Sequence, residues 1–217
     1  MKKETKKNFG IAAILLGAFV AWTEAVRLVD VQPIGPQGST VGFATVNSWV
    51  HNLTGVHMSL YTVTDWLGLV PIAFAIGFAL LGLIQWIHRK HIRKVDFSIL
   101  VLGGFYLLVM AAYVLFEMLV INYRPVLING HLEASYPSST TMLVLCVMPT
   151  AIMQLNTRIK SKTLKRCATF GITAFIIFMV IGRLLSGVQW FTDIVGGALL
   201  SAGLVMLYHS ITSLEIK

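Results

Sequence analysis

The segment GRLLSGVQWFTD, at residues 182–193, follows a long apolar run and carries an arginine, a glutamine and an aspartate. Two shorter segments upstream also lie at the ends of apolar runs: YRP at residues 123–125 and YPSST at residues 136–140. Charged side chains are costly in an apolar setting, and where they occur they usually mark function. We therefore expect the three segments to meet at one end of a bundle of apolar helices.

The composition indicates a membrane protein. Hydrophobic residues make up 56% of the 217 residues, charged residues only 12%, and the mean hydropathy is +0.78. Soluble domains carry about 25% charged residues. A transmembrane helix needs about 20 consecutive apolar residues, which leaves room for roughly six spans with short loops. We predict an all-α integral membrane protein with six transmembrane helices, folded as a single membrane-embedded domain over residues 1–217.

The apolar runs predict where these spans lie. They are residues 9–29, 65–87, 97–121, 137–156, 167–185 and 192–211. A basic start followed by an apolar run also suits a signal peptide, but the first run is long for one, so we expect it to be retained. Between the first two spans, residues 42–64 are mixed in character with apolar side chains at helical spacing. This pattern predicts a helix lying in the outer interface of the membrane.

The net charge of +8 is explained by membrane orientation, with no role for nucleic acid. All but three of the 17 Lys and Arg residues lie in the N-terminal tail, in residues 88–94 and 158–166, or at the last residue. These segments alternate along the chain with segments poor in basic residues, which is the positive-inside pattern. We expect a multi-pass plasma membrane protein with both termini in the cytoplasm and the three motif segments on the extracytoplasmic side.

The three remaining cations are Arg27, Arg124 and Arg183. Arg27 follows Glu24 by three residues, so the two side chains share a helix face and are expected to form an ion pair. Arg124 and Arg183 belong to the motif segments. A guanidinium group matches the geometry of phosphate oxygens and stays charged at any physiological pH. These two arginines are therefore candidates for binding an anion.

A serine-rich helix start follows Pro137. Proline is tolerated at the first helical position and serine caps helices well. The free N–H groups and the positive dipole end of such a start can bind an anion. Ordinary capping, with arginines that extend to the membrane interface, would explain the same residues without a ligand. Because both features fall on the same side, we favour a phosphate-binding site formed by Arg124, Ser138, Ser139 and Arg183.

Together the segments resemble the motifs of the type 2 phosphatidic acid phosphatase family, whose pattern is KxxxxxxRP, PSGH and SRxxxxxHxxxD. The motifs correspond here to residues 117–125, 137–140 and 182–193. The resemblance implies the helical bundle that this family shares with the haloperoxidases. It further implies phosphatase activity on a phosphorylated membrane lipid, with no cofactor and no metal ion.

The chain departs from the family at the positions that carry the chemistry. In the family, the third-motif histidine is the nucleophile, the aspartate orients it, and the second-motif histidine protonates the leaving group. These positions hold Gln189, Asp193 and Thr140 here. An amide is a poor nucleophile, and a hydroxyl cannot act as a general acid near neutral pH. The resemblance therefore implies a phosphate site whose covalent and proton-transfer residues are missing.

Two further residues bear on the chemistry. Glu117 occupies the first-motif lysine position, where a carboxylate repels phosphate unless it is protonated or paired with an arginine. His131 lies in the loop before the second motif and is the alternative histidine, although Asp193 is spaced to orient residue 189. We expect a lipid phosphatase relative with impaired catalysis, binding phosphatidic acid, phosphatidylglycerol phosphate or a polyprenyl phosphate.

Two alternatives remain open at this stage. One is a non-catalytic protein that binds, senses or helps to transport a lipid phosphate. The other is a structural membrane protein whose arginines only reach the interface. Turnover separates the first alternative from a phosphatase, because both share the binding residues. The sequence leaves open the lipid, the oligomeric state, and whether Gln189 is natural or an engineered replacement of a histidine.

Overall fold

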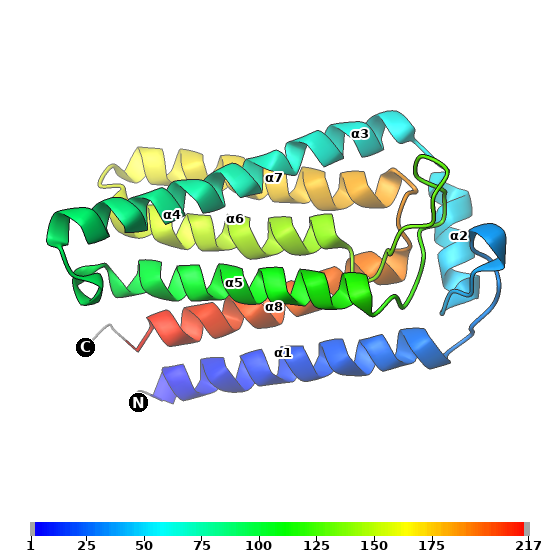
Figure 1. The fold of residues 1–217 in the computed structure, drawn as a ribbon, viewed down its shortest axis with the longest axis horizontal. Helices are drawn as coiled ribbons and strands as arrows, with labels where there is room; N and C mark the ends of the chain where they lie inside the picture. Colours follow the sequence, from blue (N-terminus) through cyan, green and yellow to red (C-terminus); the bar gives the residue numbers. More distant parts are fainter. Residues whose placement is uncertain (1–2, 215–217) are drawn as a thin grey trace.

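The computed structural model describes residues 3–214 and is a bundle of long helices lying side by side (Figure 1). The helices of the bundle are α1 (Lys3–Leu28), α4 (Leu69–Arg89) with the short α3 (Met58–Leu67) directly before it, α5 (Phe97–Met118), α6 (Ser139–Arg158), α7 (Lys162–Leu185) and α8 (Phe191–Thr212). With α3 and α4 joined, six helices of the described chain are long and apolar enough to cross a membrane. The predicted all-α architecture with six spans is confirmed.

Shorter elements complete the described chain. They are α2 (Ala44–Thr54) and two 3-10 turns, Pro36–Gly38 and Ile92–Lys94. Helix α2 lies at the same end of the bundle as the loop between α5 and α6 (Figure 1). The side chain of Asn47 joins α2 to the start of α8, because its amide donates to Thr192 Oγ1 at 2.9 Å and accepts from the backbone N–H of Thr192.

Helices α6 and α8 form the centre of the bundle. In the most apolar 18-residue stretch of each of these two helices, half of the residues are buried. The corresponding share is 17–22% for the other four spans. Small residues allow α8 to approach its neighbours closely. A Cβ atom added to Gly196 would lie 2.6 Å from the Tyr136 ring, and one added to Gly203 would lie 2.7 Å from Leu16. These glycines set the distance from α8 to α1 and to the segment that enters α6.

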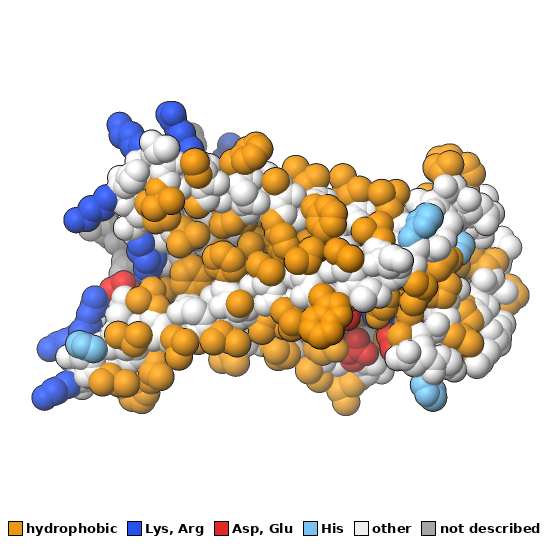
Figure 2. Space-filling model, turned by 90° about the horizontal axis from the view of Figure 1, so that it is seen from above, with side chains coloured by type: hydrophobic (Ala, Val, Ile, Leu, Met, Phe, Trp, Pro, Cys, Tyr) orange, Lys and Arg blue, Asp and Glu red, His pale blue; other side chains and the backbone are white. Residues whose placement is uncertain are grey.

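The outer surface of the bundle is apolar along its length and basic at one end. Large side chains such as Leu107 and Phe170, with exposed fractions of 74% and 78%, cover the flanks. Figure 2 shows this apolar flank, with the Lys and Arg side chains gathered at one end of the molecule. Helix α1 begins and α8 ends at this basic end (Figure 1). Such a surface suits a bundle surrounded by lipid.

A polar cluster around Asp96 holds the basic end together. The Asp96 carboxylate forms ion pairs with Arg89 at 2.9 Å and with Arg158 at 3.4 Å, and it accepts a hydrogen bond from Gln85 at 2.8 Å. Burial raises the pKa of Asp96, but hydrogen bonds from Gln85 and Arg89, together with the charges of Arg89 and Arg158, lower it by more, so the pKa lies below its usual value of 3.8. The cluster connects the α4–α5 turn to the end of α6.

The second span begins earlier than the sequence predicts. Residues 58–64, expected within an interfacial helix, form α3, which continues through Gly68 into α4 as one span over Met58–Arg89. Hydroxyl side chains make this stretch look polar in sequence. In the structure, Thr62 and Thr64 donate to carbonyl groups one turn back, at 3.0 and 2.9 Å, so they are satisfied within their own helix. The third span ends at Met118, three residues earlier than expected.

Candidate functional site

The three motif segments meet at the end of the bundle opposite the basic end. Arg124 lies in the loop after α5, Ser138 is the N-cap of α6, and Arg183 lies in the last turn of α7. A cavity of about 620 Å³ opens there. Its polar lining consists of Tyr61, Asp65, Tyr113, Glu117, Tyr123, Arg124, Glu133, Ser139, Thr140 and Arg183. We refer to it as the arginine cavity.

The two guanidinium groups of the cavity are buried. The exposed fraction is 8% for Arg124 and 1% for Arg183, although charged residues are seldom fully buried unless paired. Both lie over the ring of Tyr61, with Cζ at 5.9 Å from the ring centre for Arg124 and 4.8 Å for Arg183. The negative face of an aromatic ring attracts a cation at such distances. Tyr61 therefore supports both arginines at one wall of the cavity.

Each arginine also has one carboxylate neighbour. Arg183 Nη1 lies 3.6 Å from Asp65 Oδ1 and donates to Thr64 Oγ1 at 3.4 Å. Arg124 Nε lies 3.1 Å from Glu133 Oε2, and its backbone N–H donates to the Glu133 carbonyl group at 3.0 Å. The Nε contact lacks hydrogen-bond geometry. Within residues 3–214, Arg124 Nε and Nη1 and Arg183 Nε thus have no hydrogen-bond partner.

Two arginines that line the cavity thus carry buried N–H groups that are unpaired within the described chain. Buried polar atoms in native proteins nearly always have a hydrogen-bond partner, so an unpaired set on two adjacent cations is unusual. An oxygen-rich anion would supply the missing acceptors, and its bonds to guanidinium groups would be charge-assisted. The arrangement is therefore chemically suited to a phosphate group.

Ser138 and Gln189 lie behind the cavity wall. Both are buried, and neither lines the arginine cavity. The Ser138 hydroxyl group donates to Gln189 Oε1, lies 2.8 Å from Thr141 Oγ1, and accepts from the backbone N–H of Thr141 at 3.3 Å. Ser138 therefore caps α6 and holds Gln189. Ser139 and Thr140 instead face the cavity from the first turn of α6.

Asp193 bonds to the loop before α6. Its carboxylate is fully buried and accepts hydrogen bonds from Asn122 at 3.0 Å, from Ser135, and from the backbone N–H of Trp190 at 3.1 Å. Among the described residues, none of its hydrogen bonds reaches Gln189. The aspartate therefore joins both ends of the α5–α6 loop to the start of α8. Sequence reasoning found neither Asn122 nor Ser135.

The remaining sequence candidates are Glu117 and His131. Glu117, in the last turn of α5, is exposed and lines the cavity, and it forms no ion pair within the described chain. His131 is exposed near the tip of the α5–α6 loop, where its backbone N–H bonds to Ile128, and it does not line the cavity. The structure thus brings Glu117 to the arginines and leaves His131 outside.

Sequence reasoning missed four polar side chains of the cavity: Tyr61, Asp65, Tyr113 and Glu133. Tyr61 and Asp65 are four residues apart on α3 and so share one helix face. That spacing was visible in the sequence, but it carries meaning only once α3 is recognised as part of the second span. Glu133 lies in an irregular loop, where no periodicity marks it.

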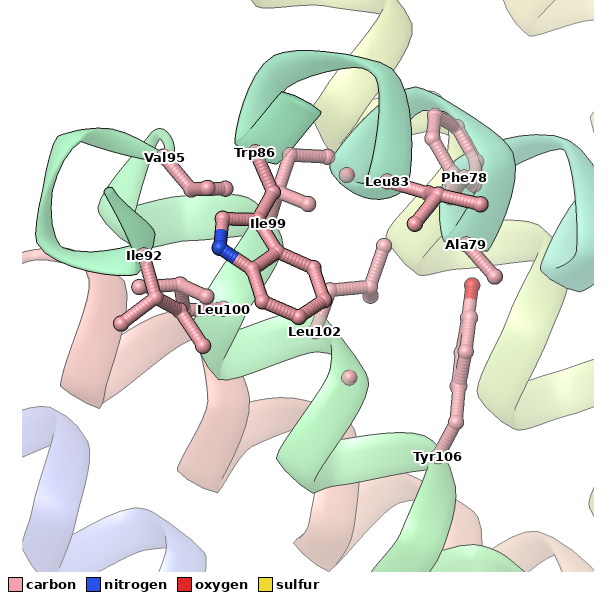
Figure 3. Close-up of a pocket in the computed structure, with 12 residues that line it drawn as sticks. Phe78, Ala79, Leu83, Trp86, Ile92, Val95, Ile99, Leu100, Leu102 and Tyr106 are labelled. Atoms are coloured by element: carbon pink, nitrogen blue, oxygen red, sulfur yellow. The ribbon is translucent and has the colours of Figure 1, made fainter. Parts of the chain in front are cut away.

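An apolar groove adjoins the arginine cavity. It has a volume of about 740 Å³, runs along α4, α5 and α6, and shares Tyr113, Ser139 and Thr140 with the cavity. A further apolar pocket of about 290 Å³ shares Ala79, Gly103 and Tyr106 with this groove. Figure 3 shows that pocket between α4 and α5, with Trp86 and Ile92 among its lining side chains. The apolar hollows therefore extend from the cavity toward the basic end.

Comparison with known proteins gives one family-model match, in the second part of the chain. No curated protein sequence matches the chain significantly. Among solved structures, the chain is similar to the crystal structure of a transmembrane PAP2 type phosphatidylglycerolphosphate phosphatase from Bacillus subtilis. That similarity has 19% sequence identity and a TM-score of 0.47, and it covers 100% of this chain and 98% of the other. Residues 119–217 match the model of the PAP2 superfamily.

Proposed function

We propose that this protein binds the phosphate group of a membrane lipid in the arginine cavity, and that its hydrolysis of that lipid by the family's histidine route is impaired. One observation carries the proposal: two buried guanidinium groups line one cavity and have N–H groups without a hydrogen-bond partner in the described chain. A phosphate group supplies several oxygen acceptors in the geometry that guanidinium groups match.

The first turn of α6 supports the same ligand. Ser139 and Thr140 line the cavity at the start of a 20-residue helix. The first N–H groups of a helix have no partner within it, and the helix dipole favours negative charge there. The helix start therefore adds donors to those of Arg124 and Arg183.

The adjoining groove favours a lipid over a free phosphate ion. A lipid held at its phosphate would place its apolar chain along α4, α5 and α6, in the groove that shares Tyr113 with the cavity. Entry would be lateral, from the leaflet, so that the chain need not leave the bilayer. Phosphatidic acid, phosphatidylglycerol phosphate and polyprenyl phosphates are the ligand classes we consider.

The impairment of hydrolysis is inferred from residue chemistry. Gln189 has no lone pair available on its amide nitrogen, and its oxygen accepts a hydrogen bond from Ser138. Thr140 cannot donate a proton to a leaving alkoxide near neutral pH. We therefore expect binding without turnover, with Arg124, Ser139 and Arg183 at the cavity.

We further propose that the arginine cavity lies at the extracytoplasmic leaflet of the plasma membrane, with both termini in the cytoplasm. The support is the gathering of basic residues at the opposite end of the bundle (Figure 2). Single cysteines placed in residues 126–136 should react with an impermeant thiol reagent from outside intact cells. Labelling restricted to inverted vesicles would overturn this orientation.

The binding proposal is tested with Arg124→Ala, Arg183→Ala and the double variant. Native mass spectrometry of the full chain in detergent would count bound phosphatidic acid. We expect each single change to weaken binding roughly tenfold or more, since hydrogen bonds to charged groups are worth about 1.5–3 kcal/mol. The control is Arg27→Ala, an exposed cation whose ion pair with Glu24 lies outside the cavity.

Thermal unfolding of each variant shows whether it is folded. Arg183→Lys serves where the alanine variant unfolds, because it keeps a charge but loses the planar fork. If a folded double variant binds phosphatidic acid as tightly as the unchanged chain, the cavity is not the phosphate site.

A further inference from the structure

The arginine cavity carries more acidic than basic side chains. Two arginines line it together with three carboxylates, Asp65, Glu117 and Glu133. Asp65 is paired with Arg183 and Glu133 with Arg124, and Glu117 has no ion pair within residues 3–214. With all five groups ionised, the cavity therefore has one uncompensated negative charge, located on Glu117.

This charge balance is unfavourable for a ligand that is only anionic. A phosphate held by the arginines would stand in the same cavity as an unpaired carboxylate, and like charges repel at such range. The arginines nevertheless require acceptors, because Arg124 and Arg183 are more than nine-tenths buried and have N–H groups without a partner in the described chain. A ligand that satisfies both conditions carries an anion and a cation together.

An ammonium group fits beside Glu117. Tyr113 lies one turn before Glu117 on the same face of α5, and both line the cavity. A carboxylate and an aromatic ring together stabilise an ammonium ion, the first by charge and the second through its negative face. The Tyr61 ring is already covered by the two guanidinium groups, so the cation would lie on the α5 side.

We propose that the cavity recognises a phospholipid whose head group carries a primary ammonium group beside its phosphate, with the phosphate at Arg124 and Arg183 and the ammonium at Glu117. The inference rests on the proposed phosphate site and adds a class of lipid to the anionic lipids considered above. Phosphatidylethanolamine is the simplest lipid with this chemistry.

The test compares lipids that share a phosphodiester and differ in the alcohol of the head group. The full chain in detergent is titrated with equal amounts of phosphatidylethanolamine and phosphatidylglycerol of the same acyl chains, and native mass spectrometry counts each bound species. Both lipids carry one phosphodiester; the first adds an ammonium group, and the second adds a neutral glycerol with two hydroxyl groups. The unchanged chain should prefer phosphatidylethanolamine by roughly tenfold, the ratio expected for one charge interaction near a protein surface.

Glu117→Gln should remove this preference, and Glu117→Lys should reverse it. Because Glu117 is exposed, neither change disturbs buried packing. The matched control is Glu24→Gln, which removes an exposed carboxylate outside the cavity and should keep the preference. Equal binding of the two lipids by the unchanged chain would overturn the inference, as would a preference that survives Glu117→Gln.

Phosphatidic acid is the third probe and separates this inference from the proposed phosphate site. Binding of phosphatidic acid that depends on Arg124 and Arg183, without any effect of residue 117 on lipid choice, would leave the phosphate site standing and refute the ammonium subsite. If none of the three lipids binds, or binding ignores both arginines, the phosphate site itself fails.

Discussion

The Asn122 side chain donates a 3.0 Å hydrogen bond to Oδ1 of Asp193, which is fully buried in the first turn of α8. The second carboxylate oxygen accepts from Ser135 and from the backbone N–H of Trp190. Asn122 and Ser135 stand near the two ends of the loop between α5 and α6. This one carboxylate therefore fixes the segment that carries Arg124 relative to the helix start of α8.

Asp193→Ala should destabilise the protein. The change leaves three buried donors without their acceptor, and an unsatisfied buried donor costs about 1–3 kcal/mol. We expect the free energy of unfolding to fall by at least about 2 kcal/mol, visible as a lower thermal unfolding temperature in detergent. Glu24→Gln, at an exposed ion pair, should leave that temperature unchanged. An equal unfolding temperature for Asp193→Ala would contradict this structural role.

Tyr61→Leu should weaken binding of phosphatidic acid while Tyr61→Phe retains it. The Tyr61 ring lies under both guanidinium groups, and a cation–π contact contributes about 0.5–2 kcal/mol. Leucine removes the aromatic face, so affinity should fall roughly twofold to thirtyfold. Phenylalanine keeps the ring and is the matched control. A lipid titration followed by native mass spectrometry measures both, and equal losses in the two variants would assign the effect to the hydroxyl group.

Asp96 should make the stability of the basic end dependent on pH. Its pKa is below the usual 3.8, so the ionised carboxylate stabilises the folded protein. That stabilisation is present above the usual pKa and is lost as the pH falls through the lowered pKa. The unfolding temperature of the unchanged chain should therefore exceed that of Asp96→Asn at neutral pH, and the difference should vanish in strong acid. A difference that is constant across this range would rule out ionisation as the cause.

The transmembrane spans could be predicted because hydropathy and basic loops can be recognised in short stretches of sequence. The prediction was least accurate at α3, where Thr62 and Thr64 reduce the apparent hydropathy although their hydroxyl groups bond within the helix. This error also affected the predicted site, because Tyr61 and Asp65 lie on α3, which the sequence did not place in the second span. Because the start of the second span was misplaced, the contribution of Tyr61 and Asp65 to the cavity was not predicted.

The candidate site could be predicted only as far as its motif spacing extends. The spacing identified Arg124 and Arg183, and the structure places both at one cavity. It could not indicate which carboxylate pairs with which arginine, because those contacts join α3 to α7 and bring Glu133 back to Arg124. Nor could it show that Asp193 bonds to Asn122, which is 71 residues away in sequence.

Gln189→His should raise phosphatase turnover more than any other single change. Loss of a covalent nucleophile removes the step that divides one difficult displacement into two, and residues that act as a unit cost several powers of ten when one is missing. The unchanged chain should therefore release almost no inorganic phosphate from short-chain lipid phosphates in detergent. Histidine at position 189 should restore only part of the rate, because residue 189 is buried and does not line the cavity, and because Asp193 is already bonded to Asn122, Ser135 and Trp190.

The double variant Gln189→His with Thr140→His should be faster still, because Thr140 lines the cavity and a histidine there can protonate the leaving alkoxide. Thr140→His alone is the matched control and should stay inactive, since it supplies an acid without a nucleophile. If both variants with histidine at position 189 are inactive but still bind lipid, the result would support a binding role. Robust turnover by the unchanged chain would overturn the inference that hydrolysis is impaired, whatever the effect of Gln189→Ala.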